Sequence, residues 1–411
     1  MRNGRMAKIF KMREIVAGAK KDKQEAHAVM NKKGDLIFSN EEVKKVYLDH
    51  CLQTFKNKDA QEEAKQAVDI KELVHNIRME EESLDDFEVT EDTFDEAVQE
   101  LAKKNKRSYD FLTKAGRGFK ETIFKLIKRM IAEEVFPEKF FETTLCQLWK
   151  RKGSVANLNN HRYLHMKDWL PKLCEMLTVQ EMKPAIISGG TMYQIGGMPG
   201  HCREEHLVVV KSMIQMLLSR GEGCLVQLAD FKSFFDSENL KGIMGSLYDS
   251  KVNQKAYRIW FKLNKKAVIC VKSASGLSEK AEAGEICPQG GFGGALVSGH
   301  DLARGSKNYF VSSQDEVNYG RVRTNPQLYQ DDWLQVANSV NAARVGMMKL
   351  LCMIREKQLT CHKDKTCFVV IGNKRYISKV MKEVEKNPIM LGSQETKPSK
   401  TVLKDTGQTQ S

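Results

Sequence analysis

Two stretches of the chain determine the fold that we expect: CLVQLADFKSFFD at residues 224–236 and LYQDDWLQV at residues 328–336. The first begins with an apolar run that ends on Asp230, which is typical of a buried β-strand. The second alternates around Asp331 and Asp332 and predicts a β-hairpin with both acids at its tip. Adjacent acids among strand-forming residues are costly unless a positive charge neutralises them. The alternative for this pair is a β-turn with exposed aspartates.

Carboxylates placed in this way would suit magnesium. Mg²⁺ prefers hard oxygen ligands and keeps positions open for phosphate oxygens. Two such ions about 4 Å apart support in-line phosphoryl or nucleotidyl transfer, because one activates the attacking oxygen and the other neutralises the leaving pyrophosphate. The residues therefore predict a metal-assisted reaction at a phosphate.

The composition is that of a folded protein with a basic surface. The chain has 411 residues, of which 41% are hydrophobic and 29% charged. These values predict two or three domains and exclude collagen-like, low-complexity and wholly disordered classes. The net charge is +13, although residues 79–100 hold 11 acids and no Lys or Arg. The basic remainder favours a polyanionic partner such as nucleic acid, and a merely solvated basic surface is the alternative.

The ten cysteines are scattered and include no C-x-x-C pair. This pattern favours reduced thiols in an intracellular protein over a zinc site at Cys361, His362 and Cys367. No apolar run follows the basic start, as a secretory signal requires. None approaches the roughly 18 apolar residues of a membrane helix. We therefore expect no membrane association.

Hydrophobic spacing predicts the remaining elements. Helices are expected at 41–55, 119–131, 171–186, 207–219 and 238–252, and from a cap at Asn338 or Ser339 to about Lys357. Strands are expected at the start of 143–153 and at 366–372, with a hairpin between AVICVKS and Gly284. Glycine-rich loops lie at 189–206 and 287–305, the second opening a helix. From Asn387 onwards the sequence is polar and irregular.

The order of these motifs resembles the reverse transcriptase of non-LTR (LINE-type) retrotransposons. A strand ends on Asp230 within DFKSFFD, the turn PQGGFGG precedes a helix, and YQDD forms a hairpin. The resemblance covers roughly residues 135–385, and residues 1–60 are similar to the linker that precedes such polymerases. It implies an α+β fold of the right-hand polymerase type, in which a palm of antiparallel strands is packed on helices.

The resemblance also implies a division of the chain. Residues 1–134 would form a basic and acidic linker with a helical extension. Residues 135–222 would form the fingers with a template-contacting loop, and residues 223–385 the palm with the catalytic aspartates. Residues 386–411 would be a frayed tail in place of the thumb, which we expect to be truncated or absent. No endonuclease precedes the polymerase in this chain, so this activity would come from a partner in trans.

In the palm, the resemblance assigns the metal ligands and the gate. Asp230, Asp331 and Asp332 would hold two Mg²⁺ ions, with Mn²⁺ as a substitute; Asp331 would bridge the ions and Asp332 lie towards the primer end. Phe235 would be the aromatic gate that excludes a ribose 2′-OH, and a core phenylalanine is its alternative. For Asp236 a structural role is expected.

The resemblance assigns further residues to the nucleotide and the template. Lys150, Lys152 and Arg162 would grip the incoming triphosphate, as cations suit a departing pyrophosphate; a solvated surface is the alternative. Gln289 and Gly290 would border the nucleotide sugar and template base. The remaining assignments are Lys365 as a general acid towards pyrophosphate, and QIGGMPG at 194–200 as a template-contacting loop or a plain turn.

Two further features of the P-Q-G turn qualify its assignment. The turn could be a helix start without a ligand. In addition, Gly294 and Ala295 stand where Ser-Pro is common in the family.

The function implied is RNA-directed DNA polymerisation, which copies retrotransposon RNA from a DNA 3′-OH. Its partners would be an RNA template, a DNA primer and dNTPs. Nuclear action with cytoplasmic RNA assembly is inferred from chromosomal priming in the family, and basic clusters at 2–23 and 103–107 are compatible with it. One alternative is a truncated, inactive RNA-binding relic. An RNA-templated RNA polymerase is a third reading, disfavoured by Phe235 and the P-Q-G turn.

Overall fold

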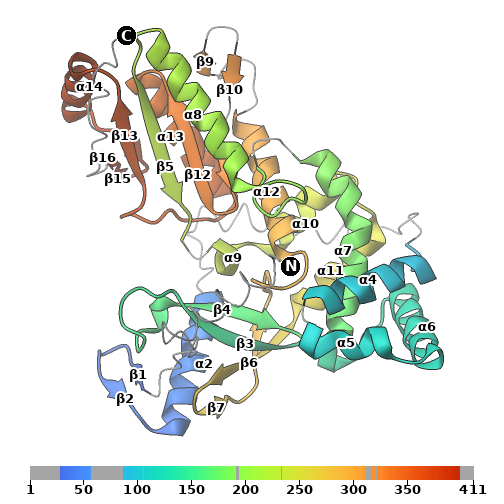
Figure 1. Ribbon diagram of the computed structural model, residues 1–411. Helices are drawn as coiled ribbons and strands as arrows, with labels where there is room; N and C mark the ends of the chain where they lie inside the picture. Colours follow the sequence, from blue (N-terminus) through green and yellow to red (C-terminus); the bar gives the residue numbers. More distant parts are fainter. Residues whose placement is uncertain are drawn as a thin grey trace, which may run out of the picture.

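The computed structural model of the protein contains two five-stranded sheets and a group of helices beside them (Figure 1). It describes residues 28–56, 87–104, 106–190, 194–232, 234–310, 317–319, 322–324 and 326–398. The basic cluster at 2–23 and the first part of the acidic stretch lie outside these residues. The α+β class predicted from the sequence is confirmed, while the assignment to the right-hand polymerases stays a prediction.

The first sheet contains both stretches that decided the expected fold. Its strand order is β11 (Gln327–Tyr329), β12 (Asp332–Ala337), β5 (Cys224–Asp230), β13 (Cys367–Ile371) and β16 (Lys397–Pro398). All pairings are antiparallel except β13 with β16. The predicted strand at 224–230, hairpin at 328–336 and strand at 366–372 are confirmed.

Two helices cover the faces of this sheet, which explains the apolar run in β5 (Figure 1). On one face, Leu225 and Ala229 pack with α13 (Val340–Glu356). On the other, Cys224 and Val226 pack with α8 (Arg203–Ser219). A strand buried on both sides reads as continuously apolar. Of the two predicted caps, Ser339 is the one observed: its side chain accepts a hydrogen bond from the backbone N–H of Ala342 at the start of α13.

The second sheet has the order β4 (His161–Met166), β3 (Glu142–Trp149), β6 (Ala267–Ser273) and β7 (Gly276–Leu277), with β8 (Ala281–Gly284) also paired to β6. Strands β3 and β6 run parallel, and the other pairs run antiparallel. Helix α2 (Asn40–Lys56) buries Val43, Tyr47 and Phe55 against one face. The predicted helix at 41–55, the strand after 143 and the hairpin at β6 are confirmed.

A third core lies among the helices. Its members are α4 (Glu91–Lys104), α5 (Lys106–Lys114), α6 (Arg117–Glu133), α7 (Trp169–Gly189), α10 (Leu240–Asp249), α11 (Gln254–Lys265) and α12 (Gly294–Phe310). The second half of the acidic stretch forms part of this core. Phe94, Val98 and Leu101 of α4 are buried in this core, and the acids of the helix alternate with them.

The tail differs from the prediction. Helix α14 (Lys374–Lys386) is followed by β14 (Met390–Leu391) and β15 (Gln394–Glu395), and then by β16 in the first sheet. Ile389 and Leu391 are buried in the core beside α13, and the backbone N–H of Thr396 donates to the carbonyl of Ile389 at 2.8 Å. The prediction of an irregular tail is therefore wrong for 390–398, because two apolar residues were enough to anchor it. Residues 399–411 lie outside the described part.

The remaining elements are short. They are β1 (Val29–Met30) with β2 (Leu36–Ile37), β9 (Val317–Tyr319) with β10 (Val322–Thr324), the helix α9 (Phe234–Ser237), and 3₁₀ turns at Glu138–Phe141 and Leu158–Asn160. Within the described ranges, no helix is both long and apolar enough to cross a membrane.

Candidate active site

The three predicted aspartates meet at one edge of the first sheet. The antiparallel register of β12 and β5 places Asp332 directly opposite Asp230, about 100 residues earlier in the chain. The carbonyl of Asp331 accepts from the backbone N–H of Phe231 at 3.1 Å, which ties it to the same end of β5. Backbone pairing therefore brings together carboxylates that the sequence keeps far apart.

The acidic pair follows a tight turn at Gln330. This residue has a φ of +55°, a left-handed conformation that is uncommon outside glycine and costs on the order of 1 kcal/mol. The turn separates β11 from β12, so that Tyr329 pairs with Asp332 across it. The hairpin tip predicted around YQDD is thus formed, with Asp331 in the turn and Asp332 as the first residue of β12.

The acids affect one another electrostatically. Burial is the largest cause that raises the pKa of Asp331, and the neighbouring charge of Asp230 raises it further. The pKa of Asp332 is raised first by desolvation and then by Asp331 and Asp230. Like charges disfavour ionisation of each other, so a cation at this edge would be stabilising. Arg162 and Lys365 act in the opposite direction on Asp331.

Lys365 makes the direct contact with the acids. Its Nζ donates to Oδ2 of Asp230 at 2.6 Å, although about half of the lysine side chain stays exposed. The loop that carries it is fixed to β5, because the N–H of His362 donates to the carbonyl of Asp230 at 2.8 Å. Cys361 also forms a backbone bridge with Phe231. The structure thus brings Lys365 to the aspartates, while its role as a general acid stays a prediction.

Of the three predicted triphosphate ligands, Arg162 is the one whose charge lowers the pKa of Asp331. It is exposed on β4, on the face opposite to the buried side chains of His161 and Tyr163, and its charge reaches Asp331. Lys150 lies at the tip of the β3–β4 hairpin, where its Nζ donates to the carbonyl of Asn159 at 3.0 Å. Lys152 is exposed in the same turn.

The P-Q-G turn is fixed beside β4. The carbonyl of Gln289 accepts from the N–H of His165 at 2.9 Å, and a β-carbon at Gly290 would lie 3.3 Å from Leu164. Gly290 also has a φ of +81°, which favours glycine. The turn therefore lies next to the strand of Arg162 and leads directly into α12.

Phe235 lies half-buried on α9, with its ring 5.2 Å from that of Phe234 in an edge-on arrangement. It packs against both the helical core and the core of the first sheet. This position is compatible with both predicted roles, since the ring is neither free nor fully enclosed. The side chain of Asp236 lies outside the described part of the structure.

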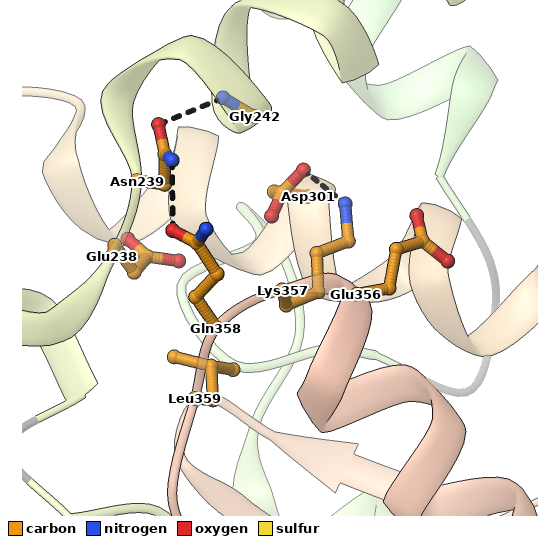
Figure 2. Close-up of a pocket in the computed structure, with 8 residues that line it drawn as sticks. All are labelled: Glu238, Asn239, Gly242, Asp301, Glu356, Lys357, Gln358 and Leu359. Atoms are coloured by element: carbon orange, nitrogen blue, oxygen red, sulfur yellow. Dashed lines mark hydrogen bonds and ion pairs between the residues drawn. The ribbon is translucent and has the colours of Figure 1, made fainter. Parts of the chain in front are cut away.

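A buried polar network behind α9 was not predicted. Glu238 is 3% exposed and accepts a hydrogen bond from Ser298 of α12. Nearby, Nζ of Lys357 lies 2.5 Å from Asp301 (Figure 2). Burial, and then the charge of Asp301, raise the pKa of Glu238 to about 8. The network borders a cavity of about 10 Å³, which is room for about one water molecule. It joins the segment after Phe235 to the helix after the P-Q-G turn.

Two other residues near the acids were missed by sequence reasoning. Arg203, the first residue of α8, lowers the pKa of Asp332 by its charge. Gln194 is fully buried against the turn at Gln330. The sequence marked the loop at 194–200 by its glycines, but nothing in it singled out the glutamine.

The acids suit magnesium by their chemistry, since they present hard oxygens at one sheet edge. Burial, and then the neighbouring acidic charges, raise the pKa values of Asp331 and Asp332. The ammonium of Lys365 supplies part of the compensating positive charge. Over the described ranges, no three His, Cys, Asp or Glu side chains converge as they stand on a point that could hold a metal ion. Metal binding would therefore require these side chains to turn towards a common ion.

Comparisons with known proteins show only distant likeness. No protein-family model and no curated protein matches the sequence. The telomerase from Candida albicans, solved in complex with a TWJ fragment of telomeric RNA, matches with a TM-score of 0.41 and 12% identity, over 61% of this chain and 46% of that one. The apo telomerase from Candida tropicalis, truncated from its C-terminal domain, matches with a TM-score of 0.40 and 10% identity, over 62% and 56%.

The match spans about half the length of these solved telomerase chains. At these values the likeness identifies neither a family nor an activity. The interpretation of the site therefore rests on its own residues.

Proposed function

We propose that the protein is an RNA-directed DNA polymerase that adds deoxynucleotides to a DNA 3′-OH, as reverse transcriptases of the non-LTR type do. The observation that carries this proposal is the register that sets Asp332 opposite Asp230, with Asp331 in the adjoining turn. Three carboxylates at one sheet edge, beside Arg162 and Lys365, suit transfer at a phosphate better than a structural role. A sheet edge gains no stability from this cluster, in which burial and like charges raise the pKa values of Asp331 and Asp332.

Each residue then has a task. Asp230, Asp331 and Asp332 would hold Mg²⁺, with Mn²⁺ as a substitute. When bound, the metal activates the primer oxygen and neutralises the leaving pyrophosphate. Arg162, with Lys150 and Lys152 at the hairpin tip, would bind the triphosphate.

The remaining residues select the nucleotide and supply a proton. Phe235 would exclude the ribose 2′-OH, while Gln289 and Gly290 would border the sugar and the template base. Lys365 would donate a proton from Nζ to the departing pyrophosphate. Its Nζ already lies at the acidic edge, 2.6 Å from Oδ2 of Asp230.

The proposal extends to partners and place. The template would be element RNA and the primer a nicked chromosomal end. Action in the nucleus would follow from such a primer, after RNA assembly in the cytoplasm. The basic excess of the chain supports a nucleic-acid partner.

The test is primer extension on poly(rA)/oligo(dT) with purified protein, Mg²⁺ and dTTP. We expect extension by the wild type, none by Asp331→Asn, and normal extension by Asp95→Asn, which changes an exposed acid on α4. Template binding is measured on all three proteins. Extension by Asp331→Asn would remove Asp331 from the catalytic set.

The same assay separates the alternative readings. Intact template binding without extension by the wild type would favour an inactive RNA-binding relic. Extension with ribonucleotides in preference to deoxynucleotides would favour an RNA-templated RNA polymerase.

A further inference from the structure

Gln194 binds both backbone groups of Gln330, the turn residue that precedes the acidic pair. Its Oε1 accepts from the N–H of Gln330 at 3.1 Å and from the N–H of Gly196 at 2.9 Å. Its Nε2 donates to the carbonyl of Gln330 at 3.3 Å. The side chain is fully buried, so water does not compete for these bonds. One amide thus satisfies both backbone groups of a single residue.

Gln330, the residue that Gln194 binds, has a strained backbone conformation. Gln330 lies in the left-handed region, which a glutamine adopts at a cost of about 1 kcal/mol. A buried side-chain hydrogen bond contributes a similar amount, so two of them can offset this cost. Gly196 makes the approach possible, since a β-carbon there would overlap the backbone nitrogen of Gln330.

The loop that carries Gln194 is itself fixed on its other side. A β-carbon at Gly299 of α12 would lie 2.9 Å from the carbonyl oxygen of Gly196, and one at Gly197 would lie 2.8 Å from the carbonyl oxygen of Ala295. The loop is therefore packed between the acidic turn and the helix that follows the P-Q-G turn. Its backbone also bonds to β11, since the N–H of Ile195 donates to the carbonyl of Leu328 at 3.3 Å.

We propose that Gln194 is a positioning residue that fixes the backbone of the turn, and through it the orientation of the Asp331 and Asp332 carboxylates. Asp331 is then held from two directions: Gln194 fixes the residue before it, and Phe231 binds its carbonyl. The inference rests on the proposed function for its catalytic consequence. The contact itself requires only the described geometry.

The test compares Gln194→Met with Gln227→Met. Both variants replace a fully buried glutamine by a side chain of similar size that makes no such bonds. Gln227 lies on β5 in the same sheet, but it donates to the carbonyl of Ala343 on α13, away from the turn. Loss of a buried hydrogen bond lowers stability in both variants, so only the acidic turn distinguishes them.

Three readouts are made on folded protein. In Gln194→Met we expect the amide of Gln330 to exchange at least about 10-fold faster, and Mn²⁺ affinity, measured by electron paramagnetic resonance, to fall about 10-fold. We expect kcat for nucleotide addition to fall about 10- to 100-fold with little change in nucleotide KM, since small misplacement of catalytic groups is costly. Gln227→Met should match the wild type in all three.

The outcomes separate the two proposals. Unchanged exchange at Gln330 in Gln194→Met overturns the contact, and faster exchange with unchanged Mn²⁺ affinity and kcat overturns the positioning role. An equal fall of kcat in Gln227→Met also overturns the positioning role. If the wild type neither binds Mn²⁺ nor extends a primer, the proposed function fails and the positioning role fails with it, whereas the exchange measurement still decides the contact.

Discussion

The buried acid Glu238 makes the stability of this protein depend on pH in a direction opposite to that of ordinary carboxylates. Its pKa is raised from 4.5 to about 8, first by burial and then by the charge of Asp301. Hydrogen bonds from Ser298 and Cys287 and the charge of Lys357 oppose this shift. At neutral pH the folded chain therefore keeps a proton that the unfolded chain has released.

The magnitude follows from the two values. Between pH 4.5 and 8 the folded state binds one more proton than the unfolded state, so stability falls as pH rises. Each pH unit in this window corresponds to about 1.4 kcal/mol. Between about pH 5 and 8 the wild type should lose up to about 3.5 kcal/mol through this one group. Glu238→Gln keeps the shape of the neutral acid and removes the proton exchange.

The assay is urea unfolding at pH 5, 6, 7 and 8, followed by tryptophan fluorescence, with the free energy extrapolated to water. The quantity measured is the stability of Glu238→Gln minus that of the wild type, in which titration of all other groups cancels. We expect this difference to grow with pH. Glu282→Gln, an exposed acid on β8, should follow the wild type throughout.

A difference that stays constant within about 0.5 kcal/mol between pH 5 and 8 would refute the reasoning, because a single shifted pKa must produce a slope. A difference that shrinks as pH rises would mean that Glu238 is charged in the folded protein. In that case the ion pair of Asp301 with Lys357 would extend to include it.

Three further perturbations test the packing and the site. Gly196→Ala should lower the unfolding free energy by about 1–3 kcal/mol and abolish nucleotide addition, since its β-carbon overlaps Gln330. Gly118→Ala in α6 meets open space and should not lower the unfolding free energy in the same urea assay. Trp333→Ala removes a fully buried indole and should cost about 3–5 kcal/mol in the same assay; a loss below about 1 kcal/mol would contradict its burial. Phe235→Ala should raise ribonucleotide over deoxynucleotide incorporation about 10- to 100-fold in a competition assay, and an unchanged ratio would show that Phe235 is not the gate.

Local signals in the sequence predicted the elements of the first sheet well. The apolar run before Asp230 became β5, the alternation around YQDD became a hairpin, and Ser339 capped the helix that follows. These features depend on residues close together in the chain, whose periodicity and capping chemistry can be read directly. The tail at 390–398 was missed because its anchors, Ile389 and Leu391, are too few to form a pattern.

The sequence by itself thus determined the main strands of the first sheet and the helices with clear apolar spacing, and it marked Asp230, Asp331 and Asp332 as the candidates for chemistry. The tertiary structure alone decided that these residues meet, through the register that sets Asp332 opposite Asp230 and the ion pair that places Lys365 on it. It also decided the contacts of Gln194 and the raised pKa of Glu238. The physical reason is that strand register, burial and long-range hydrogen bonds depend on residues distant in sequence, which no local pattern encodes.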